Sequence, residues 1–262
     1  MARYQAILAY DGTGFAGSQR QAKKRTVQGE FEAALRRLNW MGRSILLAGR
    51  TDTGVHASGQ VAAFDLEWRH SPQALAKALN ANLPPDLAVR HLSVARPDFH
   101  PRFDALSRTY RYRLFSAEVR DPLRERYAWR VWPPPDGKIL PELASLWIGK
   151  HDFAAFGSPT RPGSGTVRTV LAAFWQEQED GWTFEVQADA FLYRMVRRLA
   201  YIQTAAAQGR LSAETIARAL QEPASALSRT GLLPAGLAPA CGLTLVRVTY
   251  PAEESQFVEI LV

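Results

Sequence analysis

Ser-Ile-Leu-Leu-Ala-Gly-Arg-Thr-Asp-Thr-Gly-Val-His-Ala-Ser-Gly-Gln-Val-Ala-Ala-Phe occupies residues 44–64 and consists of two apolar runs around a polar turn. Residues 44–48 and 61–64 have the length and composition of short buried strands. Between them, Arg50, Asp52 and Gly54 lie at alternate positions. The stretch therefore predicts a strand, a turn and a second strand, with one carboxylate held near a guanidinium.

Asp52 allows two interpretations at this point. A carboxylate on a rigid turn near an arginine suits nucleophilic or acid–base chemistry. The same residue types at this spacing also form ordinary Asx turns, in which the carboxylate accepts hydrogen bonds from backbone amides near Gly54. The spacing alone leaves both interpretations open.

Predicted strands and helices alternate on both sides of this unit. Residues 3–10 predict a strand that ends in the glycine-rich turn 11–14, and Thr26 predicts the start of a helix. Further helices are predicted at 72–81, 141–149, from about 191, and at 212–221, and further strands at 87–94, 109–115, 166–176, 182–188 and 243–250. This succession predicts an α/β or α+β protein of two similar halves joined near residue 105.

Length and composition narrow the class of protein. A chain of 262 residues can bury a full hydrophobic core. No apolar run approaches the roughly 18 residues that a membrane-spanning helix needs. The first residues lack the apolar core of a signal peptide, and Cys241 is the one cysteine, which suits a reducing compartment. We therefore expect a cytoplasmic protein.

The charge balance points to an anionic partner. The sequence carries 32 Lys and Arg against 25 Asp and Glu, a net charge of +7, and most of the cations are arginine. Arginine binds phosphate in a bidentate manner and stacks on bases, although a GC-rich genome would produce the same preference. Between Arg90 and Arg130, arginines are interleaved with aromatic residues, a pattern typical of nucleic-acid binding. The aromatic residues are Phe99, Phe103, Tyr110, Tyr112, Phe115, Tyr127 and Trp129.

Three other features of the sequence do not predict a dinucleotide site, a metal site or an aspartic protease. Gly12, Gly14 and Gly17 match the dinucleotide-binding pattern, but no amphipathic helix opens at them, so we predict a tight turn. The five histidines are scattered, which disfavours a metal site. Asp52-Thr53-Gly54 is also the triplet of aspartic proteases, but the sequence holds no second triplet, and Arg50 would displace the shared proton.

The helix predicted from Phe191 carries a second group of candidate residues. Tyr193, Arg197 and Tyr201 follow one another at four-residue steps, which places them on one helical face. This face is either an ordinary solvated surface or a cation aimed at a carboxylate. The helix by itself leaves both possibilities open.

Gly49-Arg50-Thr51-Asp52-Thr53-Gly54-Val55-His56-Ala57 resembles the signature loop of the tRNA pseudouridine synthase A family. Other segments resemble the same family in the same order, namely 10–17, 26–28, 79–84, 103–105 with 108–112, 151–153, 191–197 and 242–243. Two positions depart from the family pattern: Thr53 stands where alanine is usual, and Ser18 where an aromatic residue is usual. We expect the Ser18 departure to affect the RNA contacts of its loop rather than the chemistry.

The resemblance implies an α+β fold, with two pseudo-symmetric ferredoxin-like halves that form an extended, mainly antiparallel sheet. Helices would pack on one side of this sheet, and a cationic cleft would lie on the other. Residues 1–105 would be the catalytic half that carries the Gly49–Asp52 loop, and residues 106–262 would complete the active-site cleft.

The resemblance also implies an activity, the isomerisation of uridine to pseudouridine at positions 38–40 of the tRNA anticodon stem–loop. The enzyme would act as a homodimer without metal or cofactor. Asp52 would be the nucleophile, Tyr110 would stack on the uracil, and Arg197 would pair with Asp52. Arg50 would hold backbone phosphates or fill the gap left by the extruded nucleotide. The alternative from another class is a non-catalytic RNA-binding protein.

Overall fold

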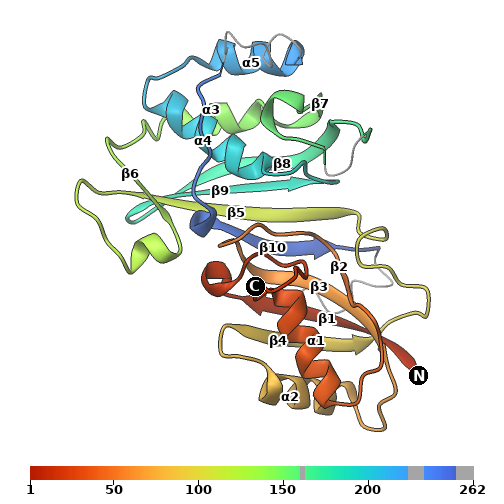
Figure 1. Cartoon of the computed structure of the whole chain (residues 1–262). Coiled ribbons are helices and arrows are strands. Elements are labelled where there is room, and N and C mark those ends of the chain that lie inside the picture. Colours follow the sequence, from red (N-terminus) through yellow and green to blue (C-terminus); the bar gives the residue numbers. More distant parts are fainter. Residues whose placement is uncertain (160–162, 224–232, 252–262) are drawn as a thin grey trace. The chain divides into compact units, whose positions relative to one another are not determined.

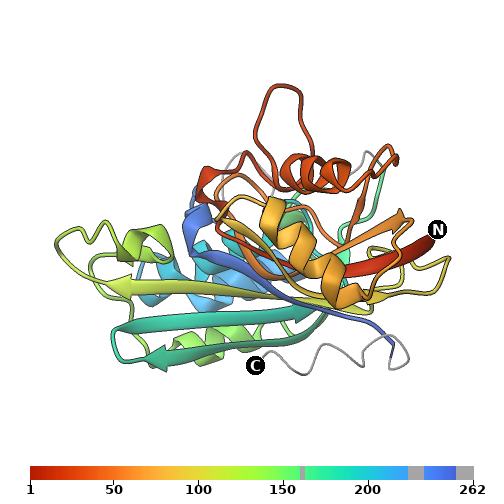
Figure 2. The same ribbon diagram turned by 90° about the horizontal axis from the view of Figure 1, so that it is seen from below.

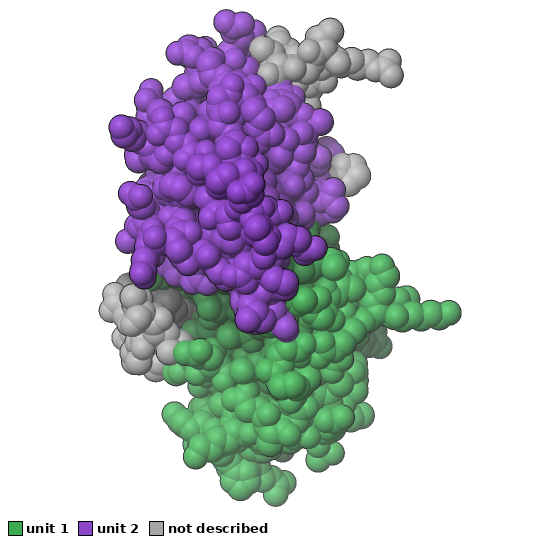
Figure 3. All heavy atoms as spheres, turned by 90° about the vertical axis from the view of Figure 1, so that its left-hand side faces the viewer, with its two compact units in different colours: residues 1–108, 244–262 green, residues 109–243 purple. Residues whose placement is uncertain are grey.

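The computed structural model describes residues 1–159, 163–223 and 233–251. The chain forms two compact units, coloured separately in Figure 3. Unit 1 comprises residues 1–108 and 244–262, and unit 2 comprises residues 109–243. The last described strand therefore belongs with the first hundred residues of the chain.

Unit 1 is built on a sheet in the order β4-β1-β3 (Figure 1). Its antiparallel strands are β1 (Ala2–Tyr10), β3 (His56–Leu66) and β4 (Leu87–Val94). The free edge of β3 pairs with two further strands: β2 (Leu46–Leu47), antiparallel, opposite Ala62 and Ala63, and β10 (Leu243–Thr249), parallel, opposite His56 and Ala57. With its helices, unit 1 has the order β-α-β-β-α-β of a ferredoxin-like fold.

Two helices pack side by side on one face of the unit 1 sheet, as the two ribbon views show (Figure 2). Helix α1 (Val27–Arg37) begins where predicted, because the Thr26 hydroxyl accepts a hydrogen bond from the Gly29 N–H. Its apolar face is buried, and Phe31 packs edge-on against Phe64 of β3 at 5.6 Å between ring centroids. Helix α2 (Pro72–Asn82) begins at Pro72, after the N-cap residue Ser71.

Unit 2 contributes the strands β5-β9-β8-β7 to the ten-stranded order of the chain. Its strands are β5 (Ser107–Ser116), β6 (Trp129–Val131), β7 (Gly149–Asp152), β8 (Val167–Gln178) and β9 (Gly181–Ala188), with β6 parallel to β5. Its helices are α3 (Leu140–Ser145), α4 (Met195–Ala207) and α5 (Ala213–Gln221). Aromatic side chains fill the core of this unit, including Tyr112, Phe115, Trp147, Phe153, Phe156 and Phe184.

The α+β class, with mostly antiparallel pairing, is confirmed. The predicted start of the long helix near Phe191 is wrong. Arg194 adopts a left-handed conformation with φ of 63°, and Tyr193 forms an isolated bridge to Ser158. Helix α4 therefore begins only at Met195, and Tyr193 does not share a helical face with Arg197.

Within the described ranges, none of the helices is both long enough and apolar enough to cross a membrane.

Candidate active site

Asp52 lies in the loop between β2 and β3, at the first position of a tight turn. The N–H of Val55 donates to the carbonyl of Asp52 at 3.1 Å, which closes the turn 52–55. Gly54 has φ of +79° at the third position, where a type II turn requires a positive φ. The backbone itself thus closes the turn that carries the carboxylate.

Thr51, which precedes Asp52, is held by three hydrogen bonds. Its N–H donates to the Ser18 hydroxyl at 2.8 Å, and its carbonyl accepts from the Ser18 N–H at 3.0 Å. Its hydroxyl lies 2.8 Å from the hydroxyl of Tyr10 at the end of β1. Burial raises the pKa of Tyr10 above its ordinary value, so this phenol stays protonated and its bond to Thr51 is neutral.

Gly49 is held in the same reciprocal manner by the fully buried side chain of Gln60 in β3. The amide oxygen of Gln60 accepts from the Gly49 N–H at 3.2 Å, and its amide nitrogen donates to the Gly49 carbonyl at 2.8 Å. Arg50 lies between two fixed residues, and its own side chain is exposed. We call Tyr10, Ser18, Gln60 and the backbone of Gly49 and Thr51 the loop clamp.

The glycine-rich turn supports the loop from its other end. Residues Gly12–Gly14 form a single 3-10 turn, which confirms the predicted tight turn. The N–H of Gly12 donates to Nδ1 of His56 at 3.0 Å, and Asp11 Oδ1 lies 3.2 Å from the same nitrogen. His56, at the start of β3, therefore ties the glycine-rich turn to the end of the Asp52 loop through its bond with Gly12.

Tyr110 and Arg197, the other two predicted site residues, belong to unit 2. The Tyr110 ring, on β5, packs edge-to-face against Phe191, with 5.1 Å between ring centroids and an interplanar angle of 89°. Arg197 lies in the first turn of α4, and its Nε donates to the carbonyl of Ala238 at 2.8 Å. The ring and the guanidinium are thus each fixed by neighbours within unit 2, whereas Arg50 and Asp52 share one loop in unit 1.

The interleaved arginines and aromatic residues between 90 and 130 have a structural explanation that the sequence analysis missed. Strand β5 alternates its side chains, so Tyr112 is buried while Arg111 pairs with Glu185 across the sheet at 2.9 Å. Phe99 and Phe115 are also buried in their units. The interpretation of these three aromatic residues as base-stacking groups was wrong, although Phe103 is 68% exposed.

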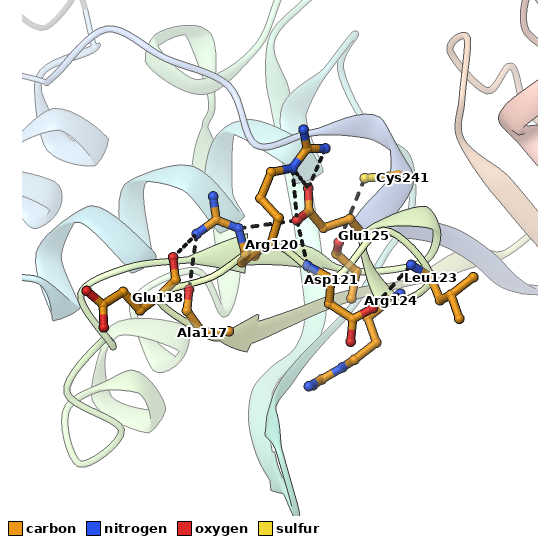
Figure 4. A network of polar contacts seen from close by, with 10 residues as sticks. Ala117, Glu118, Arg120, Asp121, Leu123, Arg124, Glu125 and Cys241 are labelled. Carbon is orange, nitrogen blue, oxygen red and sulfur yellow. Dashed lines mark hydrogen bonds and ion pairs between the residues drawn. The ribbon is translucent and has the colours of Figure 1, made fainter.

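Several arginines of this segment are engaged in ion pairs within the protein. Glu125 contacts Arg120 at 3.2 Å and Arg130 at 3.3 Å, and Figure 4 shows its carboxylate beside Arg120 and the Asp121 N–H. Arg124 pairs with Asp180 at 2.7 Å. The hydrogen bond from Arg120 is the main cause that lowers the pKa of Glu125. These contacts hold the segment 117–130, and we call them the Glu125 network.

In the part of the chain that the structure describes, no group of three or more His, Cys, Asp or Glu side chains could hold a metal ion. His100 illustrates the structural use of a histidine here. Its Nδ1 accepts the backbone N–H of Arg102 at 3.1 Å and that of Phe103 at 3.3 Å, which fixes a turn.

Comparison with known proteins identifies the family. The family model described as tRNA pseudouridine synthase matches residues 6–104 and 143–251. The chain is 38% identical to tRNA pseudouridine synthase A of Methylacidiphilum infernorum over 252 residues, which is 96% of both chains. It is 40% identical to the proteins of that name from Chloroflexus aurantiacus, covering 97% of this chain and 90% of the relative, and Geobacillus kaustophilus, covering 96% and 95%. The fold, the loop and these matches together show that the chain belongs to the tRNA pseudouridine synthase A family.

Proposed function

We propose that this protein converts uridine to pseudouridine at positions 38–40 of the tRNA anticodon stem–loop, with Asp52 as the nucleophile and without a cofactor. Family membership makes the chain an isomerase that acts on tRNA. The observation that supports the finer proposal is the position of Asp52. Asp52 is the first residue of a turn that contains Gly54. Hydrogen bonds hold the backbone of Gly49 and of Thr51, which come just before it in the chain.

The proposed reaction needs few chemical groups. The N1–C1′ bond of uridine breaks, the uracil turns, and a C5–C1′ bond forms in its place. The proton on C5 leaves to solvent and N1 gains one, so the product is an isomer of the substrate. A nucleophile at C1′ or C6, a proton acceptor for C5 and a pocket that retains the base are sufficient, and a carboxylate can supply the first.

The roles of the other site residues follow from their chemistry. We assign Tyr110 to stack on the uracil and to accept the C5 proton, since the T-shaped contact with Phe191 fixes the orientation of its ring. We assign Arg197 to pair with Asp52, because a carboxylate buried beneath a base loses its charge unless a cation restores it. We assign Arg50, exposed between two fixed residues, to the phosphates or to the gap left by the extruded nucleotide.

In this proposal residues 1–105 carry the nucleophile, residues 106–262 complete a cationic cleft, and the protein acts as a cytoplasmic homodimer. A base inside a stem must leave the stack, which costs a few kcal/mol. A net charge of +7 supports many phosphate contacts that can offset this cost.

The test is tritium release from tRNA labelled at C5 of uridine. We expect wild-type protein to release tritium and Asp52→Asn to be slower by roughly 10⁴-fold or more, while tRNA binding is retained. Asp180→Asn, at an exposed ion pair of unit 2, is the matched control and should keep its activity. A non-catalytic RNA-binding protein would release no tritium, and its Asp52→Asn variant would bind tRNA as well or better.

A further inference from the structure

Ser18 departs from the family pattern, and the structure places its side chain away from solvent. The residue is fully buried. Its hydroxyl accepts the Thr51 N–H, its own N–H donates to the Thr51 carbonyl, and its carbonyl accepts the N–H of Gln28 at 2.9 Å. RNA cannot reach a side chain in this position. The effect of the departure on the RNA contacts of the loop stays a prediction, and the Ser18 hydroxyl itself faces Thr51.

Backbone hydrogen bonds from the first residues of α1 hold Ser18 and its neighbour Gly17 in place. The Val27 N–H donates to the Gly17 carbonyl at 3.3 Å, next to the bond between Gln28 and Ser18. Gly17 has φ of +91°, and a Cβ at this position would lie 2.9 Å from the carbonyl oxygen of Thr51. The backbone of 17–18 thus lies directly against Thr51, and helix α1 holds it there.

Loss of the Ser18 hydroxyl would leave the Thr51 N–H buried without this acceptor. An unsatisfied buried donor is costly, and a backbone shift that lets it reach another partner relieves the cost. Such a shift would move the residue next to Asp52. The bonds from Tyr10 to Thr51 and from Gln60 to Gly49 restrict the loop but do not replace this acceptor.

We propose that Ser18 is a positioning residue of the reaction, which sets the orientation of Asp52 through Thr51. This inference rests on the proposed function of Asp52. It assigns to the Ser18 hydroxyl a role in turnover rather than in tRNA binding, since the hydroxyl faces the loop and not the solvent. Displacement of a reacting group by a fraction of an ångström to 1 Å is enough to lower a rate by up to about 100-fold.

The experiment compares Ser18→Ala with Ser71→Ala. The Ser71 hydroxyl also accepts a backbone N–H, that of Ala74 at 3.2 Å, but it does so at the start of α2 and outside the loop clamp. For Ser18→Ala we expect kcat to fall by roughly 10- to 100-fold, with KM for tRNA changed less than about threefold. Hydrogen exchange of the Thr51 amide should quicken by about tenfold or more. Ser71→Ala should lower thermal stability but leave kcat and the Thr51 amide unchanged.

Tyr10→Phe is a second variant, because it removes the tyrosine hydroxyl that bonds to the Thr51 side chain and keeps the aromatic ring. It should lower kcat less than Ser18→Ala does, again without a change in KM. Normal wild-type turnover together with unchanged kcat in both variants would overturn the role of Ser18 alone. Absence of tritium release from the wild-type protein would instead overturn the proposed function, and the role of Ser18 with it.

Discussion

Two irregular segments of this protein are held in place by opposite means. The loop clamp of unit 1 holds residues 49–51 through neutral hydrogen bonds from Tyr10, Ser18 and Gln60, all of which are buried. The Glu125 network of unit 2 holds residues 117–130 through ion pairs to Arg120 and Arg130. Neutral buried bonds are insensitive to salt, whereas exposed ion pairs are screened by it. The difference suggests that the loop with the proposed nucleophile keeps its geometry under conditions that weaken charged contacts.

Of the effects that bear on this comparison, the largest is that of salt, which should weaken tRNA binding but not the chemical step. Between 50 and 200 mM NaCl we expect the Kd for tRNA to rise by roughly 10³-fold, because the contacts are to phosphates. The single-turnover rate at saturating tRNA should change less than about twofold, since the loop clamp carries no charge. Filter binding and tritium release measure the two quantities. A Kd independent of salt would contradict the proposed RNA cleft.

Arg197→Met tests whether a cation of unit 2 acts on the carboxylate of unit 1. We expect kcat to fall by roughly 100-fold in the tritium-release assay while tRNA binding persists. The fall follows because a nearby cation stabilises the charge of the carboxylate in the proposed closed site. A kcat within about twofold of the wild-type value would count against the ion pair with Asp52.

Gln60→Leu and Glu125→Gln compare the two segments directly. Gln60→Leu leaves both polar groups of Gly49 without their partner and should reduce the free energy of unfolding by about 2 kcal/mol, equally at 0.1 and 1 M NaCl. Glu125→Gln should destabilise unit 2 at low salt only, because 1 M salt screens its ion pairs. Urea denaturation at the two salt concentrations gives both values. An equal response to salt in the two variants would remove the distinction.

The smallest effect concerns Arg25, which lies at the surface beside the glycine-rich turn. Its hydrogen bonds to Asp86 lower the pKa of that carboxyl. A carboxyl with a lowered folded-state pKa adds stability above its unfolded pKa of about 3.9 and loses it as the pH falls through the folded value. Because the pair is partly exposed, Arg25→Met should cost less than about 1 kcal/mol at pH 7.

The difference between wild type and Arg25→Met should therefore shrink as the pH falls from 5 to 3. Urea midpoints of both proteins across this range test the sign. A constant difference would show that Arg25 acts mainly through its stacking on Phe15, over which its guanidinium lies at 4.3 Å.

Local patterns were sufficient to predict most of the fold. Strand 87–94 and the helix starts at Thr26 and Pro72 were predicted correctly, because alternation and capping residues are local signals. The start of α4 was not, because the apolar pattern runs back to Leu192 while Arg194 adopts a left-handed conformation. Strands β6 and β7 were missed because three or four residues carry too little pattern.

The candidate site was less accessible to sequence reasoning than the fold. Asp52 and its turn could be found because Arg50, Asp52 and Gly54 are close in the chain. The bonds from Ser18 and Tyr10 to Thr51 join residues 33 and 41 positions apart, so no local pattern reveals them. The one available signal was the serine at a position where the family usually has an aromatic residue.

Strand β10 has a consequence for how the protein emerges from the ribosome. It pairs with β3 at His56 and Ala57, directly after the loop of Asp52, yet it is made almost two hundred residues later. While a nascent chain still lacks β10, that end of β3 has an unpaired edge, which is a template for wrong pairing. We expect unit 1 to complete its fold only after unit 2 has been synthesised, and the nascent chain to depend on chaperones until then.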